Sequence, residues 1–188
     1  MYPSENRQSI ILMGLKHSGK SSLGRFLAES RGWEFLDLDD LLLVPAEKEW
    51  EKRGQTDPLT CRNLYKYSPD LFREMEYLGA RRAAELMDLA PAVLALGGGT
   101  MENSRAMEVL REHGRLVYLS EDPAVLYERI LAGGLPPFLD RSDPWSSFLE
   151  IHRRRDRCCL QWADITLPLE GADLAKAGVL LNLTLTMS

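Results

Sequence analysis

The sequence has few cysteines, no long hydrophobic run and no excess of basic residues. Its three cysteines, Cys61, Cys158 and Cys159, form no C-x-x-C pair, which argues against a disulfide framework and indicates a reducing compartment, by default the cytoplasm. No apolar run approaches the roughly 18–20 residues of a membrane span, and no signal-peptide core follows the polar N-terminus. The net charge of −5 argues against nucleic acid as a partner. We therefore expect neither a membrane nor a nucleic-acid partner.

The 188 residues instead alternate between strand and helix patterns. Short apolar runs predict strands at residues 9–13, 33–38, 92–96, 115–119 and 163–169. Helical spacing of apolar residues, with caps and stops, predicts helices at 20–31, 71–89, 104–112, 122–131 and 146–162. For 41–70 we expect only short helices, and a closing helix in the tail is left open. The alternation predicts one domain, 1–188, of the α/β class, with a parallel sheet covered by helices on both faces.

Three polar strings lie at the ends of predicted strands. They read GLKHSGKSS at 14–22, DLDD at 37–40 and GGG at 97–99. In parallel sheets of this kind, ligands bind beyond the carboxyl ends of the strands. We therefore expect the three strings to face one crevice.

The first string fits the P-loop pattern G-x-x-x-x-G-K-[ST], from Gly14 to Ser21. Its glycines let consecutive backbone N–H groups turn toward a phosphate, and the helix that follows adds its positive end. We expect Lys20 to reach the β- and γ-phosphates of ATP and the Ser21 hydroxyl to ligate Mg²⁺. The alternative is a glycine-rich turn with an exposed lysine. The predicted phosphate site comprises His17 through its backbone N–H, Ser18, Gly19, Lys20, Ser21 and Ser22.

The second string supplies two acids. Asp37 and Asp39 lie two apart, so on a continuing strand their side chains would point the same way. Phosphoryl transfer needs one acid near the metal and one near the hydroxyl that is phosphorylated. We assign Asp37 to Mg²⁺, through water, and Asp39 to the acceptor hydroxyl. The alternative is an acidic helix N-terminus, because Asp40 suits a first helical turn.

Taken in order, the motifs make the chain resemble the shikimate kinase family over about residues 10–166. Beyond the P-loop and the D-x-D pair, the resemblance rests on F-R-x-x-E at 72–76, on G-G-G at 97–99, and on Arg155 ahead of Ala163-Asp164. It implies a three-layer α/β/α P-loop kinase fold with strand order 2-3-1-4-5, a shikimate-binding region at about 38–78, a mobile lid at about 133–145, and a monomer. The implied reaction is ATP-dependent phosphorylation of the shikimate 3-hydroxyl, which gives 3-phosphoshikimate and ADP on the route to aromatic amino acids.

The resemblance also implies roles for single residues. Lys20 and Asp39 would be catalytic, and Arg129 would pack against adenine. Arg73 and Arg155 would clamp the shikimate carboxylate. Glu76, three residues from Arg73 on one helix face, would hold its guanidinium; the alternative is a surface ion pair worth under about 1 kcal/mol. The full implied substrate site is Asp39, Arg73, Gly97, Gly98, Gly99 and Arg155.

The chain departs from the family in the lid. Where the family has R-P-L-L, residues 136–139 read PPFL, so Pro136 replaces an arginine that the family places on the ATP phosphates. We hypothesise that Arg141 takes over that role. The late family tyrosine is Cys159, and the G-E usual before F-R is absent. Two further hypotheses therefore stay open: a kinase of another small hydroxy-acid such as gluconate, and a nucleotide-binding module that has lost turnover.

Overall fold

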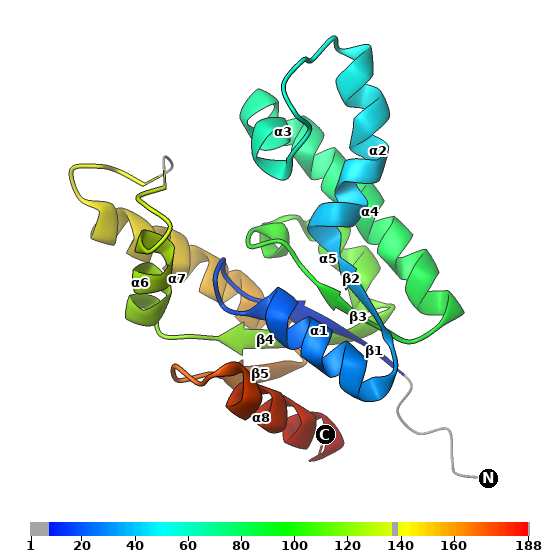
Figure 1. The fold of residues 1–188 in the computed structure, drawn as a ribbon, viewed down its shortest axis with the longest axis vertical. Coiled ribbons are helices and arrows are strands. Elements are labelled where there is room, and N and C mark those ends of the chain that lie inside the picture. The colour runs from blue at the N-terminus through cyan, green and yellow to red at the C-terminus, as the bar shows by residue number, and fades with distance from the viewer. Residues whose placement is uncertain (1–7, 137–138, 188) are drawn as a thin grey trace.

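A parallel sheet forms the centre of the part of the chain that the computed structural model describes, residues 8–136 and 139–187. Its strands are β1 (Ser9–Met13), β2 (Glu34–Asp37), β3 (Ala92–Ala95), β4 (Gly114–Ser120) and β5 (Ile165–Pro168). They pair in the order β2-β3-β1-β4-β5 (Figure 1). The predicted α/β class and strand order are confirmed.

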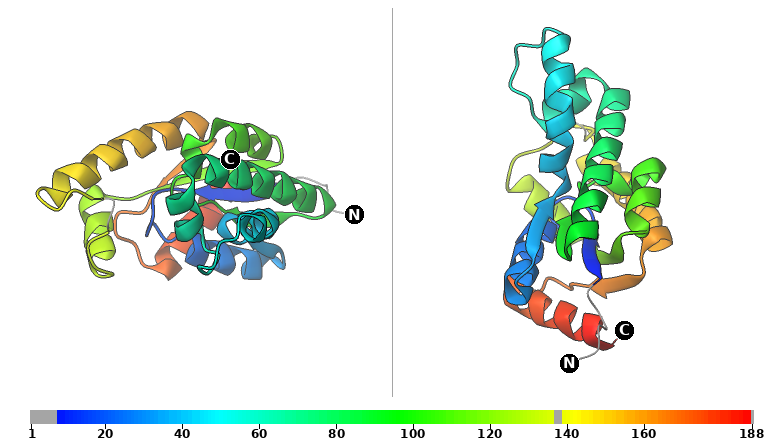
Figure 2. Two further views of the ribbon diagram at one scale, coloured as in Figure 1. Left: turned by 90° about the horizontal axis from the view of Figure 1, so that it is seen from above. Right: turned by 90° about the vertical axis from the view of Figure 1, so that its right-hand side faces the viewer.

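Helices cover both faces of the sheet (Figure 2). One face packs against α1 (Lys20–Arg31) and α8 (Leu174–Met187), and the other against α4 (Pro69–Leu89), α5 (Ser104–Arg111) and α7 (Pro144–Trp162). Alternate residues of β1 enter the two cores, Ile10 and Leu12 on the α1 side and Ile11 and Met13 on the α4 side. The strand is apolar throughout because both of its faces are buried. The tail, which the sequence left open, forms the helix α8.

The segment between β2 and α4 differs from the prediction. The helix α2 (Leu38–Lys52) begins directly after Asp37 and is 15 residues long, so the expectation of only short helices in 41–70 is wrong there. Its Pro45 lies inside the helix, where it removes one backbone hydrogen-bond donor. The short helix α3 (Cys61–Tyr67) agrees with the expectation.

The helices α2 and α3 and the start of α4 form a unit that extends beyond the carboxyl ends of the strands (Figure 1). Gly79 of α4 lets α2 come close, since a Cβ there would lie 2.9 Å from the backbone nitrogen of Leu42. The unit thereby carries α3 above the edge of the sheet where ligands are expected. Its own small core consists of Leu42, Ala46, Trp50, Leu64 and Met75.

A second small core lies on the opposite side of this edge. It joins the P-loop, α6 (Pro123–Leu131), the segment after α6, and α7. Leu139 belongs to this core, but Pro137 and Phe138, which belong to the lid motif compared above, lie outside the described residues. The core consists of Leu15, Leu126, Ile130, Leu139 and Phe148.

The other predicted boundaries agree with the structure to within two residues. A 3-10 helix, η1 (Thr100–Glu102), follows the three glycines after β3. None of the helices within 8–136 and 139–187 combines the length and the apolar character needed to cross a membrane.

Candidate active site

The loop between β1 and α1 has the curled backbone that the P-loop pattern predicts. Gly19 (φ +88°) is left-handed, and so is His17 (φ +67°), which is uncommon for a residue with a side chain. The Ser18 N–H donates to the Leu15 carbonyl at 3.2 Å. The Lys20 ammonium donates to the same carbonyl at 2.9 Å. Lys20 therefore lies inside the curl, at the start of α1.

Lys20 is a buried cation. It is 8% exposed, so the alternative of a turn with an exposed lysine is wrong. Burial lowers the pKa of Lys20 to about 8, although the charge of Asp39 partly opposes the shift. Burial, together with the charges of Lys16 and Lys20, also lowers the pKa of His17. An ammonium with a single carbonyl partner has donors left for a phosphate, whose charge would raise its pKa again.

Ser21 and Asp37 meet where β2 ends. The Ser21 hydroxyl donates to Asp37 Oδ2 at 3.0 Å. In the described part of the chain, no cluster of three or more His, Cys, Asp or Glu side chains would hold a metal ion. Two oxygen ligands nevertheless fit Mg²⁺, because this ion keeps several waters and takes further oxygens from substrate phosphates. The pair therefore suits a metal that arrives with a nucleotide.

Asp39 lies in the first turn of α2 and not on a continuing strand, so the predicted strand geometry of the acid pair is wrong. Asp37 is the N-cap of α2, with Oδ1 accepting from the Asp39 N–H at 3.1 Å, as the helix alternative requires. Asp39 still points to the sheet edge, since a Cβ on Gly97 would lie 2.7 Å from its Oδ1. Burial, with the charges of Asp37 and Glu76, raises the pKa of Asp39.

The glycines after β3 pack against other parts of the site. A Cβ at Gly98 would lie 3.0 Å from the backbone nitrogen of Lys16 in the P-loop. A Cβ at Gly99 would lie 3.0 Å from Arg155 Nη2 in α7. Positions without side chains thus let the P-loop, α2 and α7 converge. The backbone at Gly98 and Gly99 therefore lies close to other residues of the site, Lys16 and Arg155.

Arg73 and Glu76 form the predicted pair on α4, with Arg73 Nη1 3.0 Å from Glu76 Oε2. Glu76 is only 2% exposed, so the alternative of a surface ion pair is wrong. The Thr100 hydroxyl donates to Glu76 Oε1 at 2.8 Å, and Asn103 Nδ2 donates to Glu76 Oε2 at 2.8 Å. Arg73 Nη1 also donates to the Gly99 carbonyl at 3.1 Å. Glu76 thus orients the guanidinium and joins α4 to the chain after β3.

Three arginines surround Glu102 of η1. No sequence motif indicates this glutamate as a site residue. Its carboxylate accepts from Arg155 Nε at 2.9 Å and from Arg154 Nε at 2.6 Å. Arg73 Nη2 lies 4.0 Å from Glu102 Oε2. Burial would raise the pKa of Glu102, but the charges and hydrogen bonds of Arg155 and Arg154 hold it below its usual range. The two arginines expected to bind a carboxylate are therefore brought together around one acid.

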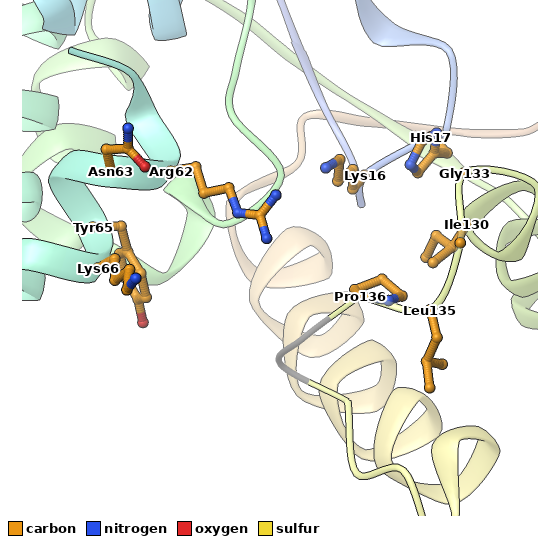
Figure 3. Close-up of a pocket in the computed structure, with 11 residues that line it drawn as sticks. Lys16, His17, Arg62, Asn63, Tyr65, Lys66, Ile130, Gly133, Leu135 and Pro136 are labelled. Carbon is orange, nitrogen blue, oxygen red and sulfur yellow. The ribbon is translucent and has the colours of Figure 1, made fainter. Parts of the chain in front are cut away.

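Two adjoining cavities lie at this edge of the sheet. The smaller cavity, of about 200 Å³, is lined by every residue of the implied substrate site: Asp39, Arg73, Gly97, Gly98, Gly99 and Arg155. The larger cavity, of about 970 Å³, lies between the P-loop, α3 and the segment that contains Pro136 (Figure 3). Tyr65 of α3 lines both cavities, so the two adjoin at α3.

Two further arginines were assigned from the sequence. Arg129 lies beside the P-loop, where its Nη1 donates to the His17 carbonyl at 3.2 Å. Its Nη2 lies 3.3 Å from Oε2 of the buried Glu121, whose Oε1 accepts from the Gly171 N–H at 3.0 Å. Arg141 is exposed and is not among the described residues that line either cavity. The role of Arg141 stays a prediction.

The chain is similar to proteins of one family. The family model for shikimate kinase matches residues 16–176, which include every predicted site residue. A shikimate kinase of Chlamydia pneumoniae is 32% identical over 166 residues, 88% of this chain and 88% of that protein. A shikimate kinase of Chloroherpeton thalassium is 36% identical over 125 residues, which are 64% of this chain and 58% of that protein, under two thirds of its length.

The similarity extends to solved structures. The shikimate kinase from Acinetobacter baumannii in complex with shikimate superimposes with a TM-score of 0.75 at 28% sequence identity. The superposition covers 98% of this chain and 96% of that one. The arrangement of the sheet and its helices is therefore shared over almost the whole of both chains.

Proposed function

The chain belongs to the shikimate kinase family, and we propose from this premise that it transfers the γ-phosphoryl group of ATP to the 3-hydroxyl of shikimate. The products are ADP and 3-phosphoshikimate, on the route to aromatic amino acids. The observation that carries the proposal is the smaller cavity, where Asp39 lies with Arg73 and Arg155 next to the P-loop. A small hydroxy-acid needs this combination, with cations for its carboxylate and an acid for its hydroxyl.

In this proposal Arg73 and Arg155 bind the shikimate carboxylate. Each guanidinium is already held by a carboxylate of the protein, Arg73 by Glu76 and Arg155 by Glu102. A guanidinium has five N–H donors, so these bonds leave donors free for the substrate. Because the side chains are ordered before the substrate arrives, less conformational entropy is lost on binding.

Asp39 acts on the acceptor hydroxyl. The oxygen–hydrogen bond of the 3-hydroxyl breaks toward the Asp39 carboxylate while its oxygen bonds to the γ-phosphorus. The bond from that phosphorus to the oxygen bridging to the β-phosphate breaks, and ADP leaves. The raised pKa of Asp39 makes its carboxylate a better proton acceptor. Lys20 neutralises charge on the γ-phosphoryl group as the transfer proceeds.

ATP binds along the P-loop, with its phosphates on the backbone N–H groups of 17–22 and its adenine against Arg129. Ser21 and Asp37 would hold Mg²⁺, which when bound neutralises charge on the β- and γ-phosphates. The described parts of the segment after α6, 133–136 and 139–145, would cover the nucleotide and exclude water. Its turn includes Gly134, in the left-handed region at φ +87°.

The experiment is an assay of ADP release from Mg·ATP with and without shikimate. We expect release that depends on shikimate, and we expect Arg73→Ala to raise the KM for shikimate by roughly 10–100-fold, because a lost charge-assisted hydrogen bond costs about 1.5–3 kcal/mol. The matched control is Arg82→Ala, on the same helix, where the pair with Glu85 is exposed. ADP release with gluconate and not with shikimate would overturn the acceptor. Nucleotide binding without release from any hydroxy-acid would overturn the kinase.

A further inference from the structure

The larger cavity has a wall of positive charge. Among the described residues that line it, Lys16, Arg62 and Lys66 are cations and none is a carboxylate. The whole chain has a net charge of −5, so this local excess runs against the overall composition. Lys16 comes from the P-loop, whereas Arg62 and Lys66 come from α3 on the opposite side (Figure 3). A cavity charged in this way attracts a polyanion from both sides.

Arg62 is the one arginine among the described residues that line this cavity, and its side chain has no partner among them. Within 8–136 and 139–187 it makes no hydrogen bond or ion pair, and it is exposed. Arg73, Arg155 and Arg129 differ, because each is already bound to a carboxylate. Figure 3 shows the Arg62 side chain reaching away from α3 into the cavity, toward the side where Lys16 and Pro136 lie. Its donors are free to meet a ligand.

Arg62 also lies where the two cavities adjoin. It is three residues before Tyr65 on α3, so both side chains share one face of the helix. Tyr65 lines the smaller cavity as well as the larger one. A phosphoryl group that passes from a nucleotide in the larger cavity to an acceptor in the smaller one crosses this junction.

We propose that Arg62 contacts the γ-phosphoryl group during its transfer. This rests on the function proposed above. Pro136, which lines the same cavity, has no side-chain donor. Among the described residues that line this cavity, the one guanidinium is that of Arg62 on α3. An arginine aimed at a transferring phosphoryl group stabilises the charge that it carries in the transition state.

The first test is kinetic, with shikimate as the acceptor. We expect Arg62→Ala to lower kcat by about 100-fold or more, since arginines in this role are worth about 10³–10⁵. The KM for shikimate should change less than threefold, because Arg62 does not touch the carboxylate clamp. Arg62→Lys should recover part of kcat, since it keeps the charge but loses the planar fork. Arg82→Ala, an exposed arginine remote from both cavities, should stay within twofold of the parent.

The second test measures nucleotide binding and not turnover. The Kd values of Mg·ADP and of a non-hydrolysable Mg·ATP analogue are measured by calorimetry. Arg62→Ala should weaken the analogue at least tenfold more than ADP, because only the analogue carries a γ-phosphate, and Arg82→Ala should leave this ratio unchanged. Loss of kcat with an unchanged ratio supports a contact made in the transition state alone. If both kcat and the ratio equal those of Arg82→Ala, the proposal is overturned. A parent enzyme without shikimate-dependent turnover overturns the proposed function and with it the role of Arg62 in transfer to shikimate. The binding ratio then tests separately whether Arg62 contacts a bound γ-phosphate.

Discussion

Glu76 offers a direct test of how a buried carboxylate holds the site together. It accepts hydrogen bonds from Arg73, Thr100 and Asn103 and is 2% exposed. Replacing it with alanine removes an acceptor from each of three donors and the nearest counter-charge from one guanidinium. Removing one partner of a fully buried ion pair costs about 3–5 kcal/mol, which is an upper limit here because the Arg73 side chain is 33% exposed. For a chain of this length, that loss lowers the midpoint of thermal unfolding by on the order of 10 °C.

The same helix supplies the control. Glu85 pairs with Arg82 at the same i, i+3 spacing and a similar distance, 2.9 Å, but both side chains are more than half exposed. Glu85→Ala should therefore cost less than about 1 kcal/mol. Glu76→Gln separates shape from charge: an amide oxygen at the Oε2 position still accepts from Arg73 and Asn103, and its NH₂ can donate to the Thr100 hydroxyl. We expect Glu76→Gln to fall between the two alanine variants.

The assay is urea unfolding of the four proteins, followed by circular dichroism. If the free energy of unfolding falls with urea at the same slope in all four proteins and only the urea midpoints differ, the variants differ in stability and not in the compactness of the unfolded state. If Glu76→Ala and Glu85→Ala lose the same free energy of unfolding, burial does not distinguish the two pairs and the reasoning fails.

Two more predictions concern titration. Because the pKa of Lys20 is about 8, about half of the molecules carry a neutral Lys20 at pH 8. Binding of Mg·ATP should restore the charge, so each molecule should take up as much as about half a proton. Calorimetry in buffers of different ionisation enthalpy measures this proton uptake. Uptake should be smaller at pH 6.5 and absent in Lys20→Arg, which stays charged; equal uptake in that variant would refute the assignment. Glu102 has a lowered pKa in the folded protein, so its stabilising contribution is complete above its ordinary pKa of 4.5 and is lost as the pH falls through the folded value. The stability difference between the parent and Glu102→Gln should thus shrink below pH 4.5, and a difference that grows there would contradict the pairing.

The sheet could be read from the sequence because each strand is a short apolar run followed by glycine or an acid. For Asp37 and Asp39, in contrast, the local geometry was predicted incorrectly. A spacing of two fits both a strand, where alternate side chains share a face, and a helix cap, where the first acid accepts from the N–H two residues on. The predicted geometry was wrong, since Asp37 caps α2 and Asp39 belongs to that helix, and the roles assigned to the two acids stay predictions.

The helix α2 could not be read from local signals. Pro45 in its interior is unfavourable in an isolated helix, and in the charged run after it only Ala46 and Trp50 continue the apolar face that Leu38 and Leu42 begin. What stabilises α2 is tertiary: it packs closely on α4 at Gly79, and Trp50 enters a core with Leu64 and Met75. Such packing overrides local propensity.

Glu102 and Arg62 were missed for a related reason. Glu102 pairs with Arg155, 53 residues away, and a single glutamate at that separation carries no pattern. Arg62 belongs to a seven-residue helix without a motif, and only the placement of α3 opposite the P-loop makes it notable. Motifs identify residues whose spacing is fixed by one local geometry, whereas residues brought together by separate elements need the fold.

The two cavities differ in charge in a way that suits their proposed ligands. The smaller one contains Asp39 and Glu76 as well as Arg73 and Arg155, and Glu102 bridges its arginines, so its positive charge is largely balanced. Such a site has enough free cationic donors for one carboxylate but would repel a second strongly charged group. The larger cavity has cations without described acids, which is what a triphosphate requires. The nucleotide should therefore be excluded from the acceptor site by charge as well as by volume. In the proposed reaction the phosphoryl group would pass from the larger cavity to the smaller one, at the junction that Tyr65 lines.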